Sequence, residues 1–218
     1  MASTSKKDRV RYERHSPGLE FDRFVFFSDA VFAIAMTLLV VGIGIPHVAS
    51  RNLEHALSEK NDEIISFFIS FLVIGYYWLA HHRFIGLIGR VDTVFMVANL
   101  AFLAAIAFTP FPTALVGVYS GHEISVVLYC ATLAAASLLL VLMLVRAYKA
   151  QLFREPMTPE YYRFSLLASS APVAAFLLAI PIAFADTSLA LPFLLVLFPI
   201  EHLLDRYVKP ADQELLDD

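Results

Sequence analysis

The chain has 218 residues, of which 59% are hydrophobic and only 17% are charged. Soluble domains are roughly half apolar and a quarter charged, so this composition indicates an integral membrane protein. The formal net charge of -4 is small, and we expect no nucleic-acid partner. The one cysteine, Cys130, lies in an apolar run. It offers no disulfide framework, thiolate metal site or redox centre.

Apolar runs separated by polar segments predict six membrane-spanning helices. The polar, basic residues 1–22 precede the first run, which is too long for a signal peptide, so we expect a retained cytosolic tail or short surface helix, broken off by Pro17-Gly18. We expect Pro46 to end the first span, and Pro110 and Pro112 to kink or end the third. The predicted spans are 24–45, 64–79, 92–118, 124–145, 164–185 and 189–204.

The polar connections predict how the helices are oriented. Residues 47–63 form a loop or short interfacial helix, and the turn near 186–188 is short enough to make the last two spans a tight hairpin. Of the 16 Lys and Arg residues, only Arg51 and Lys60 fall opposite the termini. By the positive-inside rule, both termini are cytoplasmic. The expected divisions are a basic tail at 1–22, a six-helix membrane domain at 23–207 and a short acidic tail at 208–218.

A branched apolar stripe runs along the first span. Successive residues advance about 100° around a helix, so Ile34, Leu38, Val41 and Ile45 share a face, with Thr37 on its flank. Such a stripe can face lipid or another helix. It can also line a pore, where a ring of branched side chains forms a hydrophobic constriction that gates by dewetting.

Polar residues stand at the start of the same span. Ser28 and Asp29 point away from the stripe, which argues against their forming a ring in a pore. They can form a helix-start cap with a structural hydrogen-bond network, or take a direct part in ion or proton movement. Arg23 lies some 120° from Asp29 around the helix, so each should find a partner on another helix.

Aromatic and polar side chains also mark the second and third spans. Trp78 and His82 share a helix face, while His81 is turned about 100° away. Adjacent histidines with no further ligand at metal spacing make a metal site improbable. We expect this cluster to hydrogen-bond another helix, with Asp29 as the acceptor, and Asn99 to bond between helices. Glu201 and His202 are expected to form an interface pair.

Familiar signatures of other membrane and enzyme classes are missing from the printed sequence. It contains no Thr-Val-Gly-Tyr-Gly filter loop, arginine-rich voltage-sensor helix, phosphate-binding loop, nucleophile elbow or zinc-protease motif. We therefore expect no bond-breaking chemistry and no cofactor.

Three groups of residues occur in a characteristic order. Arg23-x-x-x-Phe27-Ser28-Asp29 opens the first span, Trp78-x-x-His81-His82-x-x-Ile85 follows the second, and Asn99-Leu100 precedes Pro110-Phe111-Pro112-Thr113 in the third. Together they resemble the prokaryotic branch of the endolysosomal potassium-channel family called transmembrane protein 175. The motifs cover residues 1–120, and the remainder agrees only in hydropathy and length.

The resemblance implies a homotetramer of six-helix subunits whose first helices line a central pore. It assigns Ile34 to a hydrophobic constriction, Thr37 to potassium preference, and Leu38 and Val41 to the same wall. Val41 departs from the leucine that is frequent in the family, which would leave the upper constriction looser. The resemblance also implies that Arg23, Phe27, Ser28 and Asp29 form an interhelical network with Trp78, His81, His82 and Asn99.

The principal hypothesis is a potassium-selective, or weakly selective, channel in a prokaryotic plasma membrane, with itself, the lipid bilayer and potassium ions as partners. The alternative is a proton-coupled secondary transporter that uses Asp29, His81 and His82 as carriers. Transporters of that kind usually contain internal repeats, and no repeat relates the first three spans to the last three. A membrane enzyme with a metal at His81 and His82 ranks last.

Overall fold

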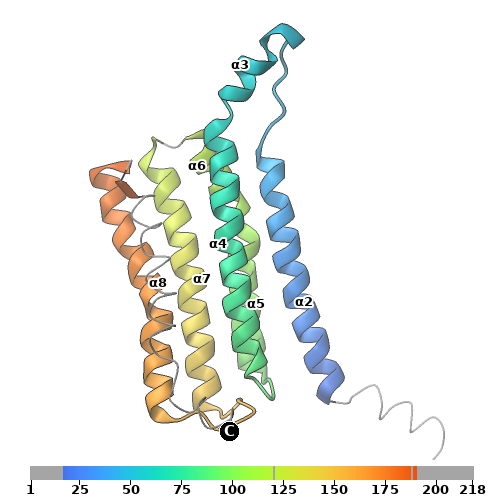
Figure 1. Ribbon diagram of the computed structural model, residues 1–218. Helices are drawn as coiled ribbons and strands as arrows, with labels where there is room; N and C mark the ends of the chain where they lie inside the picture. The colour runs from blue at the N-terminus through green and yellow to red at the C-terminus, as the bar shows by residue number, and fades with distance from the viewer. Residues whose placement is uncertain (1–16, 120, 188, 191–218) are drawn as a thin grey trace, which may run out of the picture.

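The computed structural model describes residues 17–119, 121–187 and 189–190, and these form a bundle of helices (Figure 1). One isolated antiparallel bridge, between Ile88 and Phe153, joins two connecting segments. Within these described residues, five helical stretches are long and apolar enough to cross a bilayer. The predicted sixth span, and with it Glu201 and His202, lies outside the described residues. The elements are α2 (Pro17–Leu38), η1 (Leu39–Gly42), η2 (Ser50–Asn52), α3 (Leu53–Ser58), α4 (Asn61–Gly86), α5 (Thr93–Phe108), α6 (Pro110–Val118), α7 (Glu123–Lys149) and α8 (Pro159–Ala185).

The first span differs from its prediction at both ends. Helix α2 begins at Pro17, because proline is favoured in the first helical turn, where its missing N–H has no partner to lose. The α-helix stops at Leu38, one 3-10 turn follows, and Ile43 is extended. The prediction of a helix to residue 45 is therefore wrong. Two glycines, Gly42 and Gly44, weaken the helix before Pro46 can end it.

The end predicted for the second span, residue 79, is also wrong, whereas the predicted break within the third span is present. Helix α4 continues beyond residue 79 to Gly86, so Trp78, His81 and His82 all lie within it. The predicted break in the third span is confirmed, since α5 ends at Phe108 and α6 begins at Pro110. Of the two forms expected for residues 47–63, the structure has short helices, η2 and α3.

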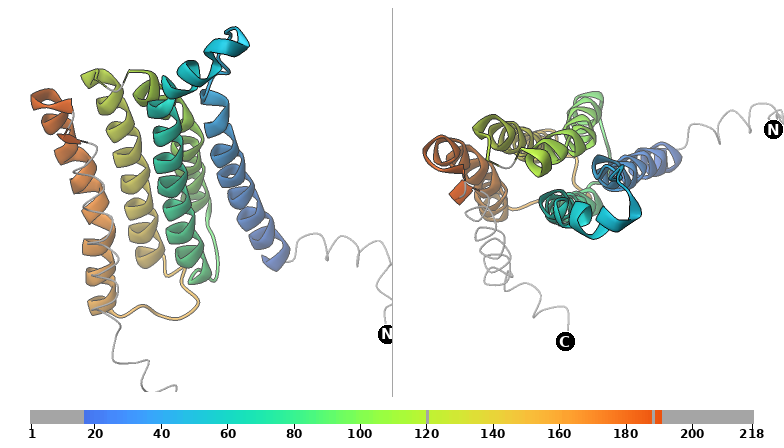
Figure 2. Two further views of the ribbon diagram at one scale, coloured as in Figure 1. Left: turned by 45° about the horizontal axis from the view of Figure 1, so that its top comes forward. Right: turned by 90° about the horizontal axis from the view of Figure 1, so that it is seen from above.

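Helix α2 lies at one edge of the bundle. It packs against α4 and α5, α4 packs against α6, and α7 packs against both α5 and α8. Figure 2, in the view from above, has α2 and α8 at opposite sides. Close approach of α4 to α6 depends on Gly117, because a Cβ atom there would lie 2.9 Å from Glu63 Cα. Small residues permit such close packing between membrane helices.

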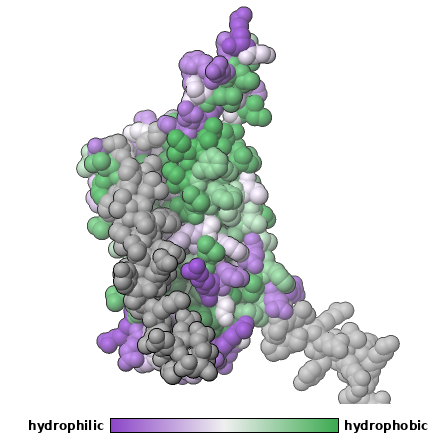
Figure 3. Space-filling view, viewed as in Figure 1, coloured by the Kyte–Doolittle hydropathy of each residue, from purple (hydrophilic) through white to green (hydrophobic). Residues whose placement is uncertain are grey.

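The buried core runs along the facing sides of α2, α4, α5 and α7. Phe32, Ile74 and Phe102 are at most 1% exposed and belong to one continuous cluster. Much of the outer surface is apolar too: Figure 3 shows hydrophobic side chains gathered over the upper half of α4, below the hydrophilic α3. A bundle that is apolar both inside and outside suits a bilayer, where helix association depends on close packing and on interhelical hydrogen bonds.

Candidate pore helix and its polar anchor

The buried side of α2 carries a hydrogen-bonded chain that joins three helices. Ser28 is fully buried and donates from Oγ to the Phe24 carbonyl, 3.0 Å away on its own helix. Asn99 of α5 donates from Nδ2 to Ser28 Oγ at 3.1 Å. With its nitrogen so used, Asn99 accepts through Oδ1 from His81 Nε2 of α4, 2.8 Å away. The chain satisfies polar groups that would be costly in hydrocarbon.

Aromatic rings enclose the histidine of this chain. The His81 ring stacks on Phe102 with 5.4 Å between centroids and 13° between planes. The ring of Phe32, from α2, also contacts His81, with 5.6 Å between the two ring centroids. These contacts leave the His81 side chain buried. His81, Asn99 and Ser28 thus form one enclosed unit within the bundle.

A second hydrogen bond ties α2 to α4. The indole Nε1 of Trp78 donates to Asp29 Oδ1 over 2.9 Å, so the hydrogen bond expected between this cluster and Asp29 is present. His82 does not share in that bond; its ring lies 5.4 Å from the Trp78 ring and its side chain is exposed. A carboxylate that accepts an N–H bond is better accommodated near a membrane than a free one.

Two residues of the sequence motif stand apart from these bonds. Arg23 is exposed and makes no hydrogen bond or ion pair with the part of the chain that the structure describes. The expectation that Arg23 pairs with another helix therefore finds no partner among the described residues and stays a prediction. Phe27 is 52% exposed and points away from the enclosed unit. Neither Arg23 nor Phe27 therefore takes part in the bond between Asp29 and Trp78 of α4.

The opposite side of α2 carries the apolar stripe, and it is exposed. Ile34 is 57% exposed, Leu38 46% and Val41 73%. Thr37 is also exposed, and its hydroxyl donates to the Ile34 carbonyl at 2.8 Å. Because the α-helix ends at Leu38, Val41 lies in the 3-10 turn and Ile45 lies outside any helix. The stripe therefore follows the α-helical wheel only for Ile34, Thr37 and Leu38.

Another hydroxyl network, which sequence reasoning did not identify, joins α4, α6 and α7. Thr113 donates to Ser70 Oγ at 2.9 Å, and Ser70 lies 3.1 Å from the Tyr129 hydroxyl. Tyr77 donates to the Leu133 carbonyl at 2.9 Å and lies 2.6 Å from Ser137 Oγ. The available signal was an isolated hydroxyl within each apolar span, which needs a partner across a helix interface.

An ion pair at the basic end of the bundle was also missed. Asp92 caps α5 by accepting from Phe95 N at 2.8 Å, and it pairs with Arg146 of α7 at 2.5 Å. The hydrogen bond from Arg146, followed by the one from Phe95, lowers the pKa of Asp92 below its ordinary value. An aspartate three residues before a backbone N–H at a helix start is a recognisable N-cap signal. The sequence gives no comparable signal for its partner Arg146, which lies 54 residues further along the chain.

The described side chains do not gather into a metal centre. Within residues 17–119, 121–187 and 189–190, no three His, Cys, Asp or Glu side chains lie close enough together to hold a metal ion. Cys130 is buried in α7. The chemistry available to α2 is therefore hydrogen bonding on one face and apolar contact on the other.

Comparison with known proteins finds a family model and named relatives that are similar to the part of the chain containing α2, α4 and α5. Residues 23–110 match the family model described as endosomal/lysosomal potassium channel TMEM175. A protein named as a potassium channel from Streptomyces collinus is 41% identical over 101 residues, which are 46% of this chain and 49% of that protein. One from Chamaesiphon minutus is 40% identical over 106 residues, 47% of this chain and 52% of its own. This chain thus spans about half the length of the curated relatives it matches.

The fold extends the likeness beyond the matched sequence. The crystal structure of a lysosomal potassium-selective channel TMEM175 homolog from Chamaesiphon minutus superposes with a TM-score of 0.74 at 27% identity. The match covers 84% of this chain and 97% of that one. The family predicted from the sequence motifs is therefore confirmed. Residues 23–110 are similar to the family of the endosomal/lysosomal potassium channel TMEM175, which is a family of ion channels and not of enzymes.

Proposed function

We propose that this chain forms a potassium channel in which the α2 helices of several subunits surround a central pore. The observation that carries the proposal is the exposed stripe of Ile34, Thr37 and Leu38 on the side of α2 that faces away from α4 and α5. An apolar stripe at a bundle edge is free to meet copies of itself across an axis. Relatives named as potassium channels support potassium as the permeant ion.

The constriction in this proposal is a ring of Ile34 side chains, with Leu38 and Val41 further along the same wall. A narrow ring of branched apolar groups excludes water from the path and sets a barrier to ions. Thr37 lies one turn from Ile34 and provides the hydroxyl oxygen nearest to that ring. Because its proton is donated to the Ile34 carbonyl, the oxygen lone pairs remain available to a potassium ion.

The polar side of α2 has a supporting role in the proposal. Bonds from Asn99 and Trp78 hold α2 at two neighbouring residues, Ser28 and Asp29. Two anchors on successive residues limit both rotation and tilt of the helix, so they fix which side chains point toward the axis. Ions then need not pass Ser28 or Asp29, and the interhelical network acts as scaffold.

The assembly we propose is a homotetramer in a prokaryotic plasma membrane, with both chain termini in the cytoplasm. Four subunits give each α2 two equivalent neighbours around a closed axis. The concentration of Lys and Arg at one end of the bundle supports the orientation through the positive-inside rule. Potassium ions and lipid are the expected partners, and no cofactor is required.

The decisive experiment measures potassium efflux from liposomes that contain the purified full-length chain. Ile34→Ala should raise efflux and weaken discrimination between potassium and sodium, because the smaller side chain widens the ring. Leu167→Ala is the matched control, since Leu167 is also an exposed apolar residue but lies on α8. Equal efflux and selectivity in Ile34→Ala and the wild type would contradict a constriction at Ile34.

The same preparation separates a channel from the proton-coupled transporter. A channel gives flux that follows the potassium gradient alone. A transporter that uses Asp29, His81 and His82 as carriers gives a saturable flux that needs a pH gradient and disappears in Asp29→Asn. That result would replace the channel proposal.

A further inference from the structure

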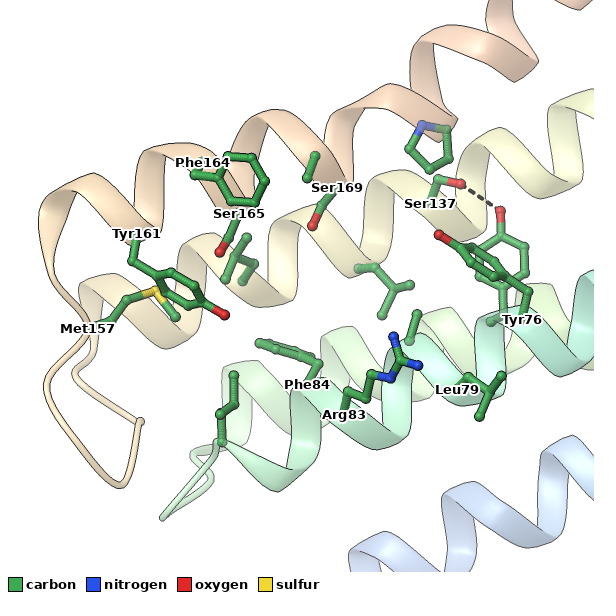
Figure 4. A pocket seen from close by; sticks show the side chains of 17 residues that line it. Tyr76, Leu79, Arg83, Phe84, Ser137, Met157, Tyr161, Phe164, Ser165 and Ser169 are labelled. Atoms are coloured by element: carbon green, nitrogen blue, oxygen red, sulfur yellow. Dashed lines mark hydrogen bonds between the residues drawn. The ribbon is translucent and has the colours of Figure 1, made fainter. Parts of the chain in front are cut away.

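A cavity of about 510 Å³ opens between α4, α7 and α8, on the side of the bundle away from α2 (Figure 4). Its size lies within the range of small-molecule sites in proteins. Most of its wall is apolar, including Leu140 and Leu144 of α7 and Phe164 of α8. In a bilayer, an opening between membrane-spanning helices is reached from the lipid.

One cation and several hydroxyl groups face this space. Figure 4 shows Arg83 extending from α4 toward α7 and α8, with the side chains of Tyr161, Ser165 and Ser169 pointing from α8 into the same cavity. None of these four side chains makes a hydrogen bond or ion pair with any residue that the structure describes. Arg83 is exposed, and an arginine near the end of a membrane-spanning helix can extend to the interface, where anionic groups of lipids are available as partners.

The position of Arg83 indicates which anion is within reach. It lies three residues before the end of α4. Three further arginines belong to this end of the bundle. Arg90 donates to the Ala150 carbonyl, Arg154 donates to the Ile88 carbonyl, and Arg146 donates to Asp92 at the start of α5. In a bilayer, lipid phosphates lie near the ends of spanning helices, and basic pockets between membrane helices on the cytoplasmic side bind anionic headgroups. A guanidinium presents a planar fork of N–H donors that matches phosphate oxygens.

We propose that this cavity binds an anionic phospholipid. The phosphate accepts hydrogen bonds from Arg83 and from the hydroxyls of Tyr161, Ser165 and Ser169. The first part of one acyl chain lies against Leu140 and Leu144. The inference requires that the bundle spans a membrane, but it does not depend on the pore, because the cavity and α2 are on opposite sides of α4.

The test measures phosphatidylglycerol retained by the purified full-length chain, with phosphatidylcholine as the uncharged competitor, using native mass spectrometry. The wild type should retain phosphatidylglycerol in preference. Arg83→Gln should weaken that binding on the order of tenfold, the loss of one charge-assisted interaction. Arg163→Gln is the matched control, since Arg163 belongs to α8 but does not line the cavity, and it should retain the wild-type preference.

A second variant keeps the test valid if Arg83→Gln folds poorly. Ser169→Leu fills the cavity with an apolar side chain, so it should reduce retention of both lipids while leaving the chain folded. Equal retention of the two lipids by the wild type, or equal losses in Arg83→Gln and Arg163→Gln, would overturn the proposal. If Arg83→Gln lowers the unfolding midpoint of the chain, added phosphatidylglycerol should stabilise the wild type more than this variant, and equal stabilisation of the two would also overturn the proposal.

Discussion

The two faces of α2 meet opposite surroundings although they belong to one helix. On one face Ser28 is fully buried, and partners from α4 and α5 bond to it and to its neighbour Asp29. On the other face Ile34 is 57% exposed and Val41 73%. In water this arrangement would be inverted. In a bilayer, polar groups must find partners inside the protein, whereas apolar groups can be left for lipid or for another subunit.

The largest expected effect comes from making the apolar face polar. Ile34→Asn should raise ion flux through liposomes on the order of tenfold, the change that follows from a barrier about 1.4 kcal/mol lower. The physical reason is that an amide holds water where a branched alkyl group expels it. Leu167→Asn on α8 should leave the flux unchanged. Equal increases in both variants would mean that polar substitution merely makes the bundle leak.

The second effect comes from removing the centre of the polar face. Asn99→Leu leaves the buried Ser28 and His81 without their shared partner, which should lower the free energy of unfolding by about 2 kcal/mol. Denaturant titration in detergent micelles measures it. Val97→Leu, an exposed position on the same helix, is the control. A loss no larger than that of Val97→Leu would mean that this network does not stabilise the bundle.

A smaller effect is expected from the single bond between Trp78 and Asp29. Trp78→Phe keeps an aromatic ring but removes the N–H donor, at a cost of about 1 kcal/mol in the free energy of unfolding. Asp29→Asn weakens the same bond from its other side. If the bond is the cause, the double variant should lose less than the two single losses together. Fully additive losses would assign the two effects to separate causes.

The smallest effect concerns pH and lies away from both faces of α2. The depressed pKa of Asp92 stabilises the folded chain fully above the ordinary aspartate value, about 4, and this stabilisation is lost as the pH falls below it. Asp92→Asn and Arg146→Gln should therefore both flatten the decline of the unfolding midpoint in acid. An unchanged slope in Asp92→Asn would contradict the role given to this ion pair.

Much of the architecture was predictable because the bilayer imposes simple rules on sequence. Apolar runs of bilayer length predicted the spans that the structure describes, and the paired prolines predicted the break between α5 and α6. Helical periodicity separated Ser28 and Asp29 from the Ile34 stripe. The Trp78 bond to Asp29 was also predictable, since both residues lie at similar depth and each lacks a partner on its own helix.

Other features depended on contacts between distant residues. Helical periodicity could not show that α2 ends at Leu38, because that end depends on glycines whose effect varies with packing, and Gly42 lies against Ala114 of α6. Nor could it pair His81 with Asn99 instead of Asp29, or Asp92 with Arg146. Such choices are made by distances across helix interfaces, which no single helix encodes.

The sequence by itself determined that this protein is a bundle of membrane helices whose first helix has a polar and an apolar face. Composition and helical periodicity suffice for that, because hydrocarbon tolerates few polar groups and a helix repeats every 3.6 residues. Only the tertiary structure decided which polar groups meet, and which face α2 leaves uncovered. Both depend on how the helices pack against one another, and packing is a property of the assembled bundle.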